Sequence, residues 1–115
     1  MSDEKTWWNG QIKKTWLGSD DHGGFTFWIN VEGNGQGQSI GNYCLYGAGK
    51  YEPWAIEAIA EILRVVKVDS WEQLPGKFVR VQSTHDKVYC IMNITDTTRW
   101  FDIVEFVRCK SWNVM

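Results

Sequence analysis

Apolar and polar residues alternate at period two along several stretches of this 115-residue chain. The clearest alternation runs from Gly24 to Val31, and similar ones run over 11–17 and 39–46. Such alternation is typical of strands with one buried face. The segment 18–24 is rich in glycine and aspartate, which predicts a hairpin between the first two strands. Gly41, inside the third stretch, predicts a bulge or a close backbone approach.

Between Pro53 and Val66 the spacing of the apolar residues changes to that of a helix. The stripe consists of Ala55, Ala58, Ile59, Ile62 and Val66. Intervals of three and four residues predict an amphipathic helix over about 53–66. Pro53 is favourable at the first helical position because the N–H that proline lacks would be unpaired there anyway. A helix of this length covers one face of a small sheet.

The second half of the chain predicts more strands. A single capped turn near Asp69 and Ser70 ends at Pro75-Gly76, and strands are expected over 78–82, 87–94 and 100–107. Runs of strands on both sides of one helix predict an α+β fold with a mostly antiparallel sheet and the helix packed on one face. The length fits a single domain, 1–115, in which residues 1–8 form a flexible N-terminus.

Composition and charge narrow the class of protein. Twelve basic and fourteen acidic residues give a net charge of −2, so no sequence-wide attraction to nucleic acid or anionic lipid is expected. The cysteines at 44, 90 and 109 lack metal-binding spacing and are odd in number, which favours reduced thiols in a cytosol. The polar N-terminus carries no secretory signal and no apolar run reaches the length of a membrane span. We therefore expect a soluble, cytoplasmic protein.

Eight tryptophans are a high number for a chain of this length. Tryptophan is enriched at the energetic centres of interfaces, although most tryptophans in a small domain fill or line its core. Trp7, Trp8 and Trp112 lie near the chain ends, which seldom belong to a core. These three are the predicted partner-binding residues.

The segment Gly33–Lys50 holds six of the eleven glycines. It does not match the dinucleotide-binding pattern G-x-G-x-x-G, because Gln38 and Ile40 stand where the last glycine is needed. It does not match a P-loop either, because Cys44 replaces the first glycine and Tyr51 replaces the serine or threonine. Two readings of the segment stay open: a binding loop or a flexible connection.

The end of that segment still favours an anion. Free N–H groups and the positive end of the dipole at a helix start attract phosphate, and an aromatic ring beside them stacks on a base. The residues predicted to form this pocket for a phosphate-bearing small molecule are Gly47, Gly49, Lys50, Tyr51 and Trp54.

The sequence contains few candidates for catalytic or metal-binding residues. Asp20-Asp21-His22 and His85-Asp86 are adjacent polar residues whose side chains diverge, as expected of hydrated turns rather than metal sites. Cys90 alternates with Val88 and Met92, which is typical of a small core residue. We therefore expect no catalytic residues, no metal and no cofactor, and a protein that is not an enzyme.

Basic residues form weak clusters. They are Lys13-Lys14, Lys77 with Arg80, and Arg108 with Lys110. Near Trp16, Phe78 and Trp112 these side chains could follow a single nucleic-acid strand through stacking and phosphate contacts. A solvated surface of mixed charge explains them equally well, and the net charge makes nucleic acid the less favoured partner.

Several short motifs carry a family resemblance. They are Asp21-His22-Gly23, Gly35-x-Gly37 with Gly41-x-Tyr43, Val68-Asp-Ser-Trp-Glu-x-Leu-x-Gly-Lys-x-Val-Arg-Val81, Asn93-Ile94 and Trp100-Phe101. Together they resemble a family of small proteins from tailed bacteriophages and prophages, with Asn42 and Tyr46 where the family pattern has a glycine and an aspartate. The resemblance brings no established activity. It implies a phage setting, in which small acidic proteins often bind host factors.

The sequence therefore predicts a non-enzymatic phage accessory protein that acts by stoichiometric binding. The favoured function is counter-defence in the cytoplasm of the bacterial host, either by inhibiting a host immune effector protein or by sequestering its nucleotide signal. A single-stranded nucleic-acid-binding accessory protein and a small nucleotide-processing enzyme are the alternatives. A homodimer that completes a pocket would suit so small a chain.

Overall fold

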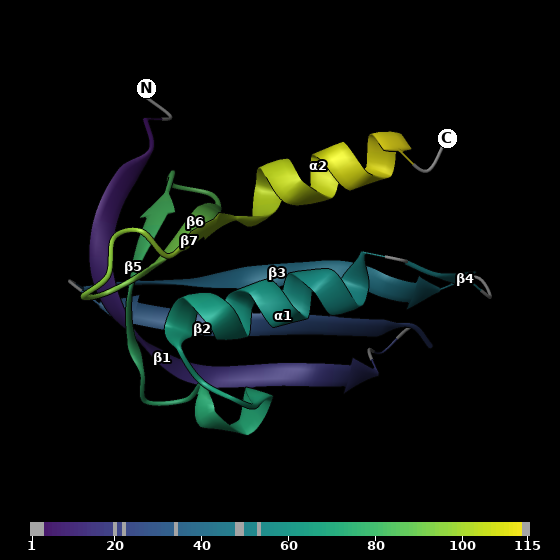
Figure 1. Ribbon diagram of the computed structural model, residues 1–115, viewed down its shortest axis with the longest axis horizontal. Coiled ribbons are helices and arrows are strands. Elements are labelled where there is room, and N and C mark those ends of the chain that lie inside the picture. Colours follow the sequence, from purple (N-terminus) through teal and green to yellow (C-terminus); the bar gives the residue numbers. More distant parts are fainter. Residues whose placement is uncertain are drawn as a thin grey trace.

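The computed structural model describes residues 4–19, 21, 23–33, 35–47, 50–52 and 54–113, with the backbone alone for 42–47, 50–51 and 111–113. The chain forms an α+β fold, as the sequence predicts (Figure 1). The elements are β1 (Thr6–Ser19), β2 (Phe25–Gly33), β3 (Gln36–Gly47), β4 (Lys50–Tyr51), α1 (Ala55–Val66), the 3₁₀ turn η1 (Trp71–Gln73), β5 (Phe78–Ser83), β6 (Val88–Asn93), β7 (Trp100–Asp102) and α2 (Ile103–Asn113).

In the described part of the chain, the strands form one antiparallel sheet in the order β4-β3-β2-β1-β5-β6-β7. The long strand β1 is shared between two halves of this sheet. Its residues 11–19 pair with β2, whereas its residues 6–11 pair with β5. We call β1 from Gln11 onward with β2, β3 and β4 the β2–β3 arm. We call β1 up to Gln11 with β5, β6 and β7 the β5–β7 arm.

Small residues and a bulge allow β1 to pass from one arm to the other. A Cβ atom on Gly33 would lie 2.3 Å from the carbonyl oxygen of Asn9, so β2 reaches this corner only without a side chain. The pairing with β2 shifts register between Ile12 and Lys14, which marks a β-bulge. The backbone of Ile12 meanwhile bonds to Gly76 and Lys77, at 2.7 and 2.8 Å, and so extends the contact toward β5.

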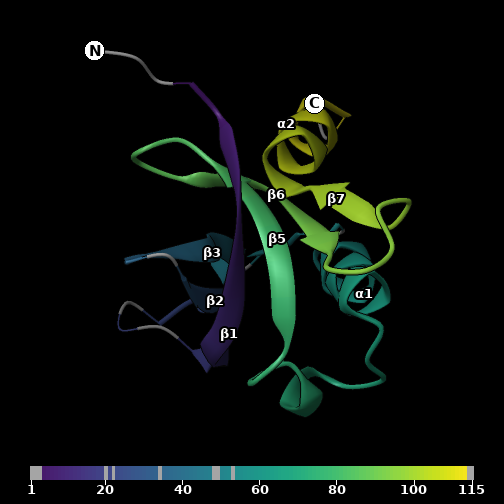
Figure 2. The ribbon, with the colours of Figure 1, turned by 90° about the vertical axis from the view of Figure 1, so that its left-hand side faces the viewer.

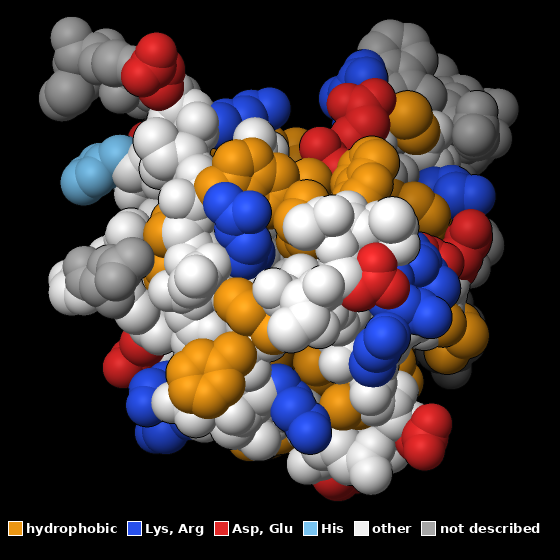
Figure 3. Space-filling model, turned by 60° about the vertical axis from the view of Figure 1, so that its left-hand side comes forward, with side chains coloured by type: hydrophobic (Ala, Val, Ile, Leu, Met, Phe, Trp, Pro, Cys, Tyr) orange, Lys and Arg blue, Asp and Glu red, His pale blue; other side chains and the backbone are white. Residues whose placement is uncertain are grey.

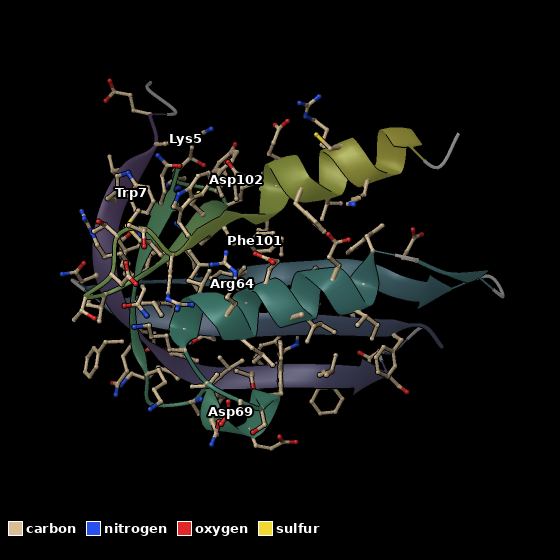
Figure 4. The ribbon with its side chains drawn as sticks, viewed as in Figure 1. Lys5, Trp7, Arg64, Asp69, Phe101 and Asp102 are labelled. Atoms are coloured by element: carbon tan, nitrogen blue, oxygen red, sulfur yellow. The ribbon has the colours of Figure 1, made fainter. Side chains whose placement is uncertain are left out.

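Both helices cover the inner face of the bent sheet (Figure 2). The residues of α1 that are buried against it are Ala58, Ile62, Val65 and Val66. In the β5–β7 arm, the inner face carries Trp8, Val81, Ile91 and Phe101 in directly opposed positions, and all four are buried. Phe101 also packs edge-on against Phe106 of α2, with ring centroids 5.1 Å apart, and lies between the two helices (Figure 4).

The Gly-rich segment is mostly regular structure. It supplies the end of β2, the turn to β3 and β3 itself. The predicted close approach at Gly41 is confirmed: its φ is +111°, the register shifts opposite Phe27, and a Cβ atom there would lie 2.7 Å from the Phe27 carbonyl oxygen. Among the described residues from Phe25 to Gly41, the glycines therefore serve the turn and the strand geometry rather than a long connection.

The prediction of a strand over 100–107 is wrong beyond Asp102. The strand β7 stops there and α2 begins, because the Asp102 carboxylate accepts a hydrogen bond from the Glu105 N–H at 2.8 Å and so caps the helix. Ile103, Phe106 and Val107 then face the core at helical spacing. At the other end of the chain, Thr6–Trp8 form the start of β1 within the sheet.

Candidate functional site

The residues predicted to bind a phosphate-bearing ligand lie where the chain passes from β3 to α1. Gly47 ends β3 and pairs with Lys50 of β4, while Gly49 and the side chains of Lys50 and Tyr51 lie outside the described residues. Trp54 is only 5% exposed, and its indole N–H donates to Glu52 at 3.0 Å. The indole of Trp54 thus packs in the core, beside a carboxylate near the helix start, and the ligand pocket stays a prediction.

The three tryptophans predicted to bind a partner have different positions. Trp7 is exposed on the outer face of β1. Its neighbour Trp8 is buried, and the Trp8 indole N–H donates to the Ser83 hydroxyl at 2.8 Å. Trp112 lies in α2, with a side chain outside the described residues. Trp8 is a core residue because β1 is a central strand, so Trp7 is the member of this pair that a partner can contact.

The outer face of the β5–β7 arm gathers aromatic side chains from several strands. Directly opposed residues in an antiparallel sheet share a face, so the registers define three rows. The rows are Trp7–Gln82–Cys90–Asp102, Asn9–Arg80–Met92–Trp100 and Gln11–Phe78. We call these side chains the aromatic face.

The aromatic face is exposed and poor in charge. Trp7 is 36% exposed, Trp100 is 52% and Phe78 is 60%. The Arg80 guanidinium lies 5.5 Å from the centre of the Trp7 ring, a cation–π contact that orients both side chains. Within the three rows Arg80 is the only basic side chain and Asp102 the only acidic one. Figure 3 views this side of the molecule and shows hydrophobic side chains reaching the surface between lysines and arginines.

Cys90 is buried in this face, and its chemistry is that of a neutral thiol. Burial raises its pKa to about 11, and the negative charge and hydrogen bond of Asp102 act in the same direction, while Lys5 opposes them. Lys5, Trp7 and Asp102 lie in the same region of the molecule in Figure 4. Because the thiolate is the nucleophilic form, Cys90 is poorly suited to nucleophilic catalysis at neutral pH.

The remaining candidates for metal or acid–base chemistry are dispersed. His85 is exposed in the turn between β5 and β6, while Asp20 and His22 lie outside the described residues. Among the described residues no three His, Cys, Asp or Glu side chains gather in a way that could hold a metal ion.

The sequence predicts only part of the aromatic face. It indicates Trp7 as a contact residue and places Phe78 near Arg80, but it does not bring Met92 and Trp100 to the same surface. That step needs the pairing of β1 with β5 and of β6 with β7, because these residues are far apart in the chain. The alternation within each strand was the available signal, and it gives the face of each residue without its neighbours.

No described helix is long and apolar enough to cross a lipid bilayer. Comparison with known proteins found no match: no family model, no curated protein and no solved structure is similar to the chain.

Proposed function

We propose that this protein acts by binding another protein through the aromatic face. The observation that carries the proposal is the composition of that face, in which exposed tryptophan and phenylalanine surround one arginine. Interface cores are enriched in Trp, Phe, Met and Arg and depleted of Lys, Glu and Asp. Tryptophan and arginine are also the residues whose truncation most often costs binding energy.

The arrangement of the face supports a preformed contact surface. Trp7, Arg80 and Trp100 stand on strands β1, β5 and β7 of one sheet whose inner face is buried in the core, so their backbone is rigid. The cation–π contact between Arg80 and Trp7 further restricts two long side chains before any partner arrives. Binding then costs less side-chain entropy than it would on a loop.

The partner we propose is a defence protein of the bacterial host. The basis is the resemblance to tailed-phage proteins, together with the acidic net charge and the tryptophan content. Binding would inhibit that effector in the host cytoplasm without turnover. The alternative is that Gly47–Trp54 sequesters a nucleotide. Protein binding is favoured over this alternative, because the aromatic face is exposed whereas the Trp54 indole packs in the core.

The test is co-purification from a bacterial host lysate followed by titration of the purified partner. Wild-type chain is expected to form a stoichiometric complex, and Trp100→Ala or Trp7→Ala to weaken it at least tenfold. Trp16→Ala is the matched control, because Trp16 is 45% exposed on the other arm. Arg80→Lys keeps the charge but loses the planar group over Trp7, so it should also weaken the complex.

Two results would contradict the proposal. One is a complex that all three aromatic-face variants form as tightly as wild type. The other combines two observations. The chain forms no stoichiometric complex with a host protein or with itself in sedimentation, and nucleotides raise its melting temperature by a shift that Lys50→Ala abolishes. The second result would favour the nucleotide-sequestering version instead.

A further inference from the structure

The outer face of the β2–β3 arm holds a polar trough that the aromatic face does not share. A hollow of about 460 Å³ is lined by Lys13, Lys14, Trp28, Asn30, Glu32 and Ser39. A second hollow of about 510 Å³ shares Lys13 and Glu32 and continues to the β2–β3 turn. Both hollows are open to solvent, as expected of a surface groove rather than of an enclosed pocket. Because they share two residues, the hollows form one extended site.

The strand registers explain why these side chains meet. Lys14 lies opposite Asn30, which lies opposite Ser39, so an amine, an amide and a hydroxyl form one row across three strands. The β-bulge after Ile12 inserts Lys13 beside that row. Two adjacent lysines therefore serve the same trough, although consecutive residues of a regular strand point to opposite faces.

Trp28 forms the aromatic end of the trough and is half-exposed. Trp28 lies opposite Gly41 on one side and Trp16 on the other. Gly41 has no side chain, so nothing from that position of β3 covers the flank of the Trp28 ring. The Trp16 indole N–H donates to the Ser19 carbonyl at 3.2 Å and the ring lies over Gly18, which keeps it flat against its own strand. Trp28 thus lines the trough, and Trp16 lies opposite it on β1 with its ring leaning toward Ser19.

The charges of the trough favour a phosphate-bearing ligand. Among the described residues neither Lys13 nor Lys14 forms an ion pair with a carboxylate, and Lys13 instead donates to the Gln11 side chain at 2.9 Å. Both ammonium groups are therefore available to phosphate oxygens. Glu32 and Asn30 stand at the polar side, where a carboxylate accepts from the amino group of a base and an amide pairs with a base edge.

From this arrangement we propose that the β2–β3 arm binds a short segment of single-stranded nucleic acid. Trp28, with Trp16 beside it, stacks bases, Lys13 and Lys14 contact phosphates, and Asn30 and Glu32 meet base edges. Binding through stacking and phosphate contact tolerates many sequences. The stretch from Trp28 to Glu32 is about 13 Å long at about 3.3 Å per residue, and the second hollow extends it, so the site is longer than one base.

The test is fluorescence anisotropy of a labelled single-stranded DNA 12-mer titrated with the full chain at 50 mM salt. Trp28→Leu should weaken binding about tenfold or more, because it removes a stacking surface, while Trp28→Phe should retain most of the affinity. With two phosphate contacts, the slope of log K against log salt should be about −1.4, and Lys14→Ala should reduce it by about 0.7. Trp100→Ala, on the aromatic face, is the matched control and should bind as wild type does.

The competing ligands are outcomes of the same assay. Binding of the 12-mer that is displaced by the same concentration of a mononucleotide or a cyclic dinucleotide would overturn a strand-binding site in favour of a free nucleotide. Equal binding by Trp28→Leu and wild type, or no binding by wild type, would overturn the proposal entirely. Because the protein-binding test uses Trp7, Arg80 and Trp100, either proposal can fail while the other stands.

Discussion

The two arms of the sheet share strand β1 and the same kind of inner face, yet their outer faces differ in chemistry. Inward positions of both arms are apolar and buried, such as Ile29 and Ile40 in one arm and Val81 and Ile91 in the other. Outward positions carry lysines, polar groups and a trough in the β2–β3 arm, and charge-poor aromatics in the β5–β7 arm. A bend in one strand thus gives a small domain two separate surfaces.

The inner faces of the two arms also differ in how far the helices cover them. Both helices pack near the β5–β7 arm, and α2 follows directly from β7. Toward the far end of the β2–β3 arm, Leu17 and Phe25 become partly exposed. The β5–β7 arm is therefore the more enclosed half, and a rigid aromatic surface is easier to maintain there.

The largest effect on stability is expected from adding a side chain at the corner where the two arms join. Gly33→Ala places a Cβ atom 2.3 Å from the Asn9 carbonyl oxygen. We expect a loss of about 3 kcal/mol or more in the free energy of unfolding, because rigid backbone must move on both sides. Urea denaturation followed by circular dichroism measures the loss.

Gly37→Ala is the control for that change, because its added atom would lie 3.2 Å from the flexible Glu32 side chain and at an ordinary contact distance of 3.7 Å from the Val31 carbonyl oxygen. It should cost much less than Gly33→Ala. Similar losses for the two variants would show that the corner is not tightly packed.

A second effect concerns the enclosure of the β5–β7 arm and depends on pH. Burial raises the pKa of Cys90 from 9.0 to about 11, so the folded state keeps the thiol proton that the unfolded state loses first. This contribution to stability is fully present below pH 9 and is lost as pH rises toward 11. Melting temperatures at pH 8, 9 and 10 should therefore fall less steeply for Cys90→Ala than for wild type. Parallel curves would contradict the enclosure of the thiol.

A smaller effect separates the two roles of Asp102. Asp102→Ala removes the cap of α2 and should cost about 1 kcal/mol of unfolding free energy. Asp102→Asn keeps a capping oxygen but removes the negative charge beside Cys90, so it should preserve stability at neutral pH and lower the pKa of the thiol. Rates of Cys90 alkylation against pH read out the second change.

The smallest effect is expected from the ion pair between the helices. The Lys110 ammonium lies 3.3 Å from the Glu57 carboxylate, and the two side chains are 37% and 54% exposed. Glu57→Gln should change the unfolding free energy by about 0.5 kcal/mol or less, because exposed ion pairs are screened by water and salt. A loss of 2 kcal/mol would mean that the helices depend on this contact.

The local elements were predictable from the sequence because their signals are local. The alternation of Phe25–Val31, the apolar stripe of α1 and the bulge at Gly41 all follow from spacing or from residue type. The strand predicted over 100–107 failed because a short apolar run fits both periods, and the decisive signal was the Asp102-x-x-Glu105 cap.

The candidate surfaces were less predictable because they depend on pairing between distant segments. Trp7 and Trp100 are joined only through β5 and β6, and Lys13 reaches the trough only because of the bulge. Trp8 illustrates the same limit, because it is buried through the pairing of β5 with β1, a strand near the start of the chain. Spacing along one segment does not contain that information.

The shared strand also has a consequence for how the chain folds. The β2–β3 arm consists of consecutive hairpins, whereas the first half of β1 pairs with a strand that follows α1, with Thr6 opposite Ser83. Contacts that close a long loop are entropically costly and form slowly. We therefore expect the β2–β3 hairpins to form early, during synthesis or refolding. The N-terminal half of β1 pairs only after β5 has been made, so the aromatic face is the last part of the surface to form.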